Sequence, residues 1–243
     1  MIFNIKHKTI FKYDNPPLSA IQKLRLTPRN DINQKILNWD IDIKGCSIEL
    51  DTFDYHDNRI HLCKTKDDIN EIEITSYGRL KIKDTNGIAG EHTSNIPIEL
   101  FKFMSSDYTK PGKKIKTLVS YFKNQFKKEN LSDLEKLNLL SKKILNEVKY
   151  LKGKTSTKTS AEDSLSLGFG VCQDHVHIFL ASARLLGFPS RYVSGYLMLN
   201  NTNIQEASHA WAEVYIENLG WVGFDISNGL SLIHISEPTR PPE

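Results

Sequence analysis

The sequence predicts an α+β protein: an amino-terminal β-sandwich, residues 1–84, and then a core, residues 97–229, in which helices pack on an antiparallel sheet. Short runs of alternating apolar and polar residues, separated by turn residues, indicate the sandwich. Apolar residues at helical spacing after residue 113, followed by two strand-like segments near the C-terminus, indicate the core. The polar residues 85–96 are expected to form a linker between the two domains.

The amino-terminal domain shows its clearest strand pattern in residues 37–43. There Leu37, Trp39, Ile41 and Ile43 alternate with polar residues and are expected to share one face of a strand. Four further strands are predicted at residues 3–11, 59–63, 71–77 and 79–83. Repeated short strands of this kind are typical of a sandwich.

Composition excludes several classes of protein. The net charge of +3 is too small to indicate nucleic-acid binding by itself. No run approaches the roughly 20 apolar residues of a membrane span, and the first residues, MIFNIKHK, do not form a secretory signal. The three cysteines form no CxxC pair, which favours free thiols and a cytoplasmic location. The histidines before residue 100 lack metal-ligand spacing, so no cofactor is expected.

The helical part begins near Pro97. Residues 113–127 place Ile115, Leu118, Val119, Phe122 and Phe126 on one face, and Ser132 to Glu135 form a capping box before a second helix. Lysines outnumber acidic residues about three to one between residues 101 and 160. We interpret this excess as solvated helix surface, with an anionic partner as the alternative.

A cysteine stands where a nucleophile is expected. Gly168 and Gly170 precede Cys172, and an apolar run at helical spacing then continues to Gly187. Cys172 should therefore lie in the first turn of a buried helix. Free backbone N–H groups and the helix dipole favour a thiolate there.

Two predicted strands carry the groups that a nucleophilic cysteine needs. His209 lies near the start of residues 208–215, and Asp225 ends residues 220–225. A cysteine needs a base to take its proton, and the base needs an acceptor that sets its tautomer. A short turn at residues 217–220 would place His209 beside Asp225 in a hairpin.

These segments, GVCQDHVHIFLASARLLGFPSRYVSGYL and SHAWAEVYIENLGWVGFDISNG, resemble the transglutaminase-like superfamily of bacterial cysteine enzymes. The resemblance covers residues 95–229, and the start of the chain is similar to the β-rich domain often fused to this core. It implies a papain-like α+β core and a catalytic triad of Cys172, His209 and Asp225. His175 departs from the family, which usually has an aromatic residue at this position.

The implied activity is acyl transfer through a thioester. His209 takes the proton of Cys172, which attacks a peptide or glutamine-type amide, and either water or an amine then attacks the thioester. We expect hydrolysis, hence a cysteine peptidase or amidase acting on peptides or proteins and not on nucleic acid or membranes. The alternatives are a crosslinking transglutaminase and a non-catalytic binding or scaffold module with a vestigial triad.

Other residues near the motif have competing interpretations. The side chain of Gln173 and the backbone N–H of Cys172 are both candidate donors to an oxyanion. Trp211 and Trp221 either line the site or pack in the core. A zinc site formed by Cys172, His175 and other histidines is the rival to a triad, but the chain has no second cysteine pair to complete it.

The tail differs from the rest of the chain. Residues 230–243 resemble translated sequencing-adapter DNA, so the native sequence is expected to diverge after Gly229. The core is then expected to be truncated, since related proteins usually continue with further strands. The open sheet edge left behind would lower stability.

Overall fold

The structure is a computed structural model that describes residues 1–17, 19–197, 208–231 and 235–239. It contains two compact units, of which the first consists mainly of residues 1–83 and the second of residues 84–235. The polar turn predicted near residues 200–206 lies outside the described residues. No helix in the described part of the chain is long and apolar enough to cross a membrane.

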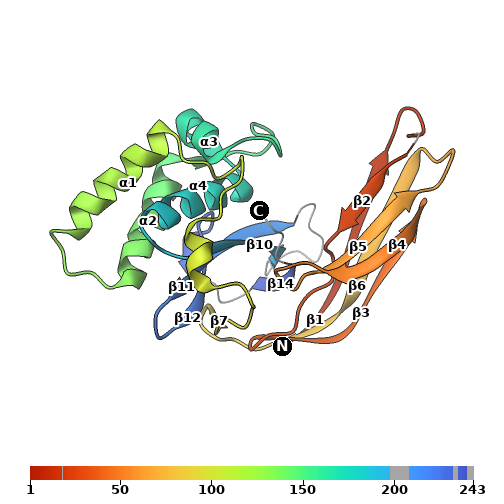
Figure 1. Ribbon diagram of the computed structural model, residues 1–243, viewed down its shortest axis with the longest axis horizontal. Coiled ribbons are helices and arrows are strands. Elements are labelled where there is room, and N and C mark those ends of the chain that lie inside the picture. Colours follow the sequence, from red (N-terminus) through yellow and green to blue (C-terminus); the bar gives the residue numbers. More distant parts are fainter. Residues whose placement is uncertain (18, 198–207, 232–234, 240–243) are drawn as a thin grey trace. The chain divides into compact units, whose positions relative to one another are not determined.

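The first unit consists of two three-stranded antiparallel sheets (Figure 1). One sheet has β6 between two neighbours, in the order β1 (Ile2–Lys12), β6 (Glu71–Ile82), β3 (Gln34–Lys44). The other has β5 in the middle, in the order β2 (Ile21–Leu24), β5 (Arg59–Thr65), β4 (Cys46–Phe53). Side chains from both sheets form the unit's core, among them Leu24, Cys63 and Ile72. The predicted sandwich is confirmed.

Two details of the strand prediction were wrong, and both concern the crossing of β3 and β6. The strands predicted at residues 71–77 and 79–83 are one continuous strand, β6. Gly78 does not mark a turn but a close approach, because a Cβ there would overlap the backbone of Asn38 and the ring of Trp39. Opposite this point β3 has a bulge between Ile36 and Asn38. Leu37 is therefore exposed, whereas Trp39 is partly buried.

The second unit contains an antiparallel sheet in which β12 (Gly220–Asp225) pairs with β11 (His209–Ile216), and β11 pairs with β10 (Ser190–Leu197). The other edge of β12 pairs with two short strands, β7 (Ile88–Gly90) and β13 (Leu230–Ser231). The β11–β12 turn occurs as predicted, with left-handed backbone at Asn218 (φ 67°) and Gly220 (φ 79°). Within the tail the structure has one more short strand, β14 (Ile235–Thr239).

Residues 85–96, which were predicted to be a linker, instead belong to the second unit and include β7. The described residues after this segment contain four α-helices: α1 (Lys113–Phe126), α2 (Asp133–Glu147), α3 (Ala161–Leu167) and α4 (Cys172–Leu185). A 3-10 helix (Ile98–Lys102) precedes them, and two short parallel strands, β8 (Lys149–Tyr150) and β9 (Phe169–Gly170), lie between them in sequence. The predicted capping box of α2 is present, with Ser132 Oγ accepting from the N–H of Glu135. A matching box at Ser160 begins α3.

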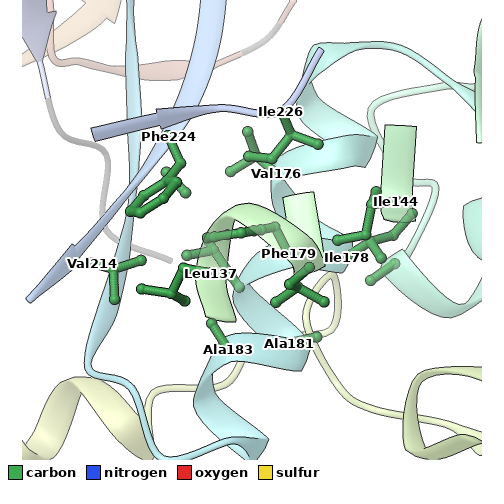
Figure 2. Packing of buried hydrophobic residues seen from close by; sticks show 14 of the residues in the cluster. Leu137, Ile144, Val176, Ile178, Phe179, Ala181, Ala183, Val214, Phe224 and Ile226 are labelled. Atoms are coloured by element: carbon green, nitrogen blue, oxygen red, sulfur yellow. The ribbon is translucent and has the colours of Figure 1, made fainter. Parts of the chain in front are cut away.

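Helix α4 is at the centre of this unit. Every residue from Asp174 to Arg184 is buried, because α1, α2 and α3 contact the helix on one side and β10 and β11 on the other. Figure 2 shows apolar side chains of α4, α2 and the sheet converging. The Phe179 and Phe224 rings pack 5.4 Å apart. The α+β core is therefore as predicted, with its nucleophile candidate at the first residue of its most buried helix.

We predict that two leucines of α2 differ sharply in their contribution to stability. Leu137 is fully buried in this core, whereas Leu134 is 37% exposed. Leu137→Ala should lower the free energy of unfolding by about 2–5 kcal/mol through lost contacts and a cavity. The matched control Leu134→Ala should lower it by less than about 1 kcal/mol. Chemical denaturation measures both, and equal losses would contradict the packing described.

Candidate active site

Cys172 is held at the start of α4 by the residues around it. Gly168 ends α3 in the left-handed conformation (φ 74°), and the chain reaches α4 through β9. Asp174 Oδ2 then accepts the N–H of Val171 at 2.8 Å, which fixes the entry to the helix. The thiol of Cys172 is partly exposed and free of any disulfide. As the first helical residue, Cys172 has a backbone N–H with no acceptor in a preceding turn.

Gly170 allows this close packing. A Cβ at this position would lie 2.6 Å from Asp174 Cβ and 2.7 Å from Ser164 Oγ. Only glycine therefore lets the strand before the nucleophile lie against α3 and the first turn of α4. Both glycines before the cysteine thus have a structural reason: one adopts a positive φ and the other permits a close approach.

The hairpin places the predicted base beside the predicted acid. His209 is the first residue of β11 and Asp225 the last of β12, so antiparallel pairing puts both at one end of the sheet. His209 Nε2 lies 2.8 Å from Asp225 Oδ2. Asp225 is 1% exposed and also accepts from Asn228, through the side-chain Nδ2 at 2.6 Å and the backbone N at 3.2 Å. The carboxylate is therefore held from two directions.

Cys172 lies close enough to His209 to raise the pKa of the imidazole, so the structure brings all three predicted triad residues together. Because Nε2 faces Asp225, the other ring nitrogen is left for the thiol. Burial lowers the pKa of His209, but the hydrogen bonds to Asp225 and Cys172, and the negative charges of both, raise this pKa to about 9. The arrangement therefore favours an imidazolium near neutral pH.

The two tryptophans and Gln173 occupy different places. Trp211 is 1% exposed and its ring stacks near that of His209, with centroids 6.4 Å apart. Trp221 contacts Phe101 and the guanidinium of Arg191 instead, so it packs in a separate core cluster. Gln173 is the second residue of α4 and partly buried.

His175 has a structural place beneath the site. Its Nδ1 lies 2.9 Å from Ser227 Oγ, and its Nε2 lies 2.9 Å from the carbonyl of Val148. Burial lowers the pKa of His175, which favours the neutral ring with both nitrogens occupied. His177 is buried between Tyr108 and Tyr192. The described residues contain no group of three or more side chains arranged to hold a metal ion.

Sequence reasoning missed three residues at the site. Asn228 orients Asp225, and its signal was an asparagine three residues after the strand-ending acid. Thr155 donates to Asp174 at 2.7 Å and ties a distant loop to the start of α4. Tyr150 lies close enough to Cys172 and Asp225 for their charges to act on its hydroxyl. No spacing in the sequence links Tyr150 or Thr155 to Cys172, because only the fold joins them.

We predict that His209 makes stability depend on pH. The pKa of His209 rises from 6.5 to about 9 on folding, so protonation of His209 favours the folded protein. This stabilisation is complete below pH 6.5 and is lost as the pH rises through about 9. The difference in unfolding free energy between the wild type and His209→Gln should therefore shrink by about 2–3 kcal/mol over this interval. Urea denaturation at several pH values measures it. A constant difference would show that His209 is not paired as described.

Two family models match the chain. The model described as the transglutaminase-like superfamily matches residues 106–226, which contain Cys172, His209 and Asp225. The model described as the bacterial transglutaminase-like N-terminal region matches residues 3–81, nearly the whole of the first unit. The two matches together cover most of the chain.

Individual relatives match over most of the chain. An uncharacterized protein of Mycobacterium leprae is 23% identical over 94% of this chain and 84% of its own length. One of Mycobacterium tuberculosis is 24% identical over 93% of this chain and 78% of its own length. The crystal structure of a candidate cysteine protease from Cytophaga hutchinsonii has the same fold, with a TM-score of 0.75 and 20% identity over 100% of this chain and 84% of that chain. The chain therefore belongs to the transglutaminase-like superfamily and carries the bacterial N-terminal region of that family.

Proposed function

We propose that the protein is a thiol-dependent acyl-transfer enzyme in which Cys172 is the nucleophile, His209 the base and Asp225 the group that orients it. The 2.8 Å hydrogen bond between His209 and Asp225, with Cys172 close enough to the imidazole to help raise its pKa to about 9, supports this proposal. A protonated imidazole beside a sulfur stabilises the thiolate, which is the reactive form of cysteine. The partial exposure of Cys172 leaves it open to a substrate.

The reaction would proceed in two steps. The thiolate of Cys172 attacks an amide carbonyl, and His209 gives its proton to the leaving nitrogen as the C–N bond breaks, which leaves a thioester. His209 then takes a proton from water as the water oxygen attacks the thioester carbonyl; the C–S bond breaks, the carboxylic acid product leaves, and the thiolate of Cys172 is restored beside protonated His209. Asp225 remains ionised and keeps the imidazole in position, as Asn228 keeps Asp225.

The start of α4 would stabilise the charge that develops on the substrate oxygen. The backbone N–H of Cys172 is a free helix-terminal donor, and the positive end of the helix dipole lies at the same place. We assign the oxyanion to this N–H, with Gln173 as a candidate second donor. Trp211, packed near the His209 ring, would limit the movement of the base.

Water is the acceptor that we propose, which makes the enzyme a cysteine peptidase or amidase acting on peptides or proteins. An amine in place of water would give a crosslinking transglutaminase with the same three residues. We also propose a reducing, cytoplasmic setting, because Cys172 must remain a free thiol. In the first unit Cys46 and Cys63 are likewise free and buried.

Alkylation of Cys172 tests the proposal directly. Labelling with iodoacetamide, followed by mass spectrometry between pH 5 and 9, should stay fast well below the ordinary thiol pKa of about 8.5. His209→Ala should slow labelling at pH 6 by about tenfold or more, since it removes the cation beside the sulfur. Cys63 is a matched internal control, because burial and the nearby Cys46 raise its pKa to about 11.

Slow labelling that follows an ordinary thiol and is unchanged in His209→Ala would contradict the enzyme hypothesis. That outcome would favour the non-catalytic binding module instead. The measurement should be repeated on a version carrying a native C-terminal continuation in place of residues 230–243, so that an effect of the tail is recognised.

The acceptor can be assigned once an acyl donor has been found. We expect added primary amine, at millimolar concentration, to divert less than about a tenth of the thioester from hydrolysis, because the proposed acceptor is water. Mass spectrometry of the products separates acid from amide. Predominant formation of the new amide would instead identify a transglutaminase.

A further inference from the structure

The segment before α3 is strongly basic. The lysine loop, residues 149–158, contains Lys149, Lys152, Lys154 and Lys158, and all four are exposed. No acidic residue occurs between Val148 and Ala161. Within the described part of the chain, none of the four lysines forms an ion pair with a carboxylate. Their charges are therefore available to a partner.

Three hydrogen bonds tie the lysine loop to residues on either side of Cys172. The N–H of Lys149 donates to the carbonyl of Gly168, and the N–H of Leu151 donates to that of Gly170, both at 2.9 Å. Farther along, Thr155 Oγ1 donates to Asp174 Oδ2 at 2.7 Å. The loop is thus attached on both sides of the nucleophile, to the strand before it and to the first turn of α4.

Tyr150 shows that this loop reaches the triad. Burial raises the pKa of the Tyr150 hydroxyl, and the negative charges of Cys172 and Asp225 raise it further. Its ring also lies 6.2 Å from that of His175. Tyr150 is nevertheless 45% exposed, so the residue of this loop that senses the triad also faces solvent.

The carboxylates near the lysine loop are already engaged elsewhere. Asp174 is buried and accepts from Thr155 and Val171. Glu147 pairs with Lys143 at 3.0 Å. On α3, Glu162 accepts from backbone N–H groups at the start of α1, and Asp163 caps its own helix. The lysine charges are therefore not neutralised locally.

We propose that the lysine loop binds acidic residues of the substrate, so that the preferred acyl donor is a peptide with glutamate or aspartate beside the scissile amide. This inference rests on the proposed function of Cys172. One exposed lysine contributes little, but four without counter-ions create a positive potential that extends over about 8 Å at physiological ionic strength. Such a field acts on association and KM more than on the chemical step.

A peptide fits this surface better than a nucleic acid. Non-specific binding of single-stranded nucleic acid uses several aromatic platforms along a basic groove. The lysine loop contains a single aromatic residue, Tyr150, and its remaining residues are Leu, Gly, Ser and Thr. Its position beside the nucleophile instead suits side chains that flank a reacting amide.

The charge of an alkylating reagent tests the field without knowledge of the substrate. Cys172 is labelled with iodoacetate, which is anionic, and with neutral iodoacetamide, and the ratio of the two rates is compared among variants. The triple variant Lys152→Gln, Lys154→Gln, Lys158→Gln should lower this ratio about threefold or more in low salt. The matched triple variant Lys116→Gln, Lys123→Gln, Lys142→Gln removes the same exposed charge from α1 and α2 and should leave the ratio unchanged.

In 0.5 M NaCl the loop variant and the wild type should have the same iodoacetate-to-iodoacetamide rate ratio, because salt screens the lysine charges. Equal ratios in both triple variants at low salt would overturn the proposal. The failure of the proposed function would look different. Labelling by iodoacetamide would then be slow in every variant and insensitive to His209→Ala.

Matched peptides test the substrate class. Two peptide libraries are compared that differ only in having Glu or Gln at the positions flanking the amide. The Glu library should be cleaved with a kcat/KM about tenfold higher, mainly through KM, and the loop variant should lose this preference while the α1/α2 variant keeps it. Equal cleavage of both libraries would overturn the proposal. So would loop-dependent binding of a labelled oligonucleotide without any preference between the libraries.

Discussion

The burial of α4 is the constraint on which the rest of the second unit depends. Every residue from Asp174 to Arg184 is buried, so rotating or sliding the helix would expose large apolar side chains at about 1.5–3 kcal/mol each. The helix is therefore held in one position between the other helices and the sheet (Figure 2). Cys172 is the first residue of this helix and is therefore fixed in position with it. In this way the hydrophobic core positions a reactive group at its edge.

The polar contacts around this helix add orientation to position. His175 joins Val148, after α2, to Ser227, after β12, and so links two segments beneath Cys172. Asn228 holds Asp225, which in turn holds His209. A buried polar group without a partner costs about 1–3 kcal/mol, so such contacts resist any rearrangement that would break them. The His175 found where the family usually has an aromatic residue is accommodated because both of its ring nitrogens have partners.

Two sets of electrostatic interactions act at the site, one over short distances and one over longer distances. At short range, burial alone would lower the pKa of His209, but its two hydrogen-bond partners more than compensate. At longer range, the lysine loop, which is bonded to Gly168, Gly170 and Asp174, adds exposed positive charge. The first arrangement bears on the state of the thiol and the second on which molecules approach it. They are built from different segments, so evolution can change substrate preference without changing the triad.

The sequence alone was sufficient to predict the α+β class, the start and end of α4, the hairpin of β11 and β12, and the three residues that meet at its end. Those features have local causes: glycines before the cysteine, helical periodicity, and alternation on either side of a turn. It did not predict that β6 continues through Gly78, that Tyr150 lies near Cys172, or that the lysine loop is bonded to the residues on either side of Cys172. These depend on contacts between segments distant in sequence, where pairing and packing decide what is adjacent, and only the tertiary structure determines them.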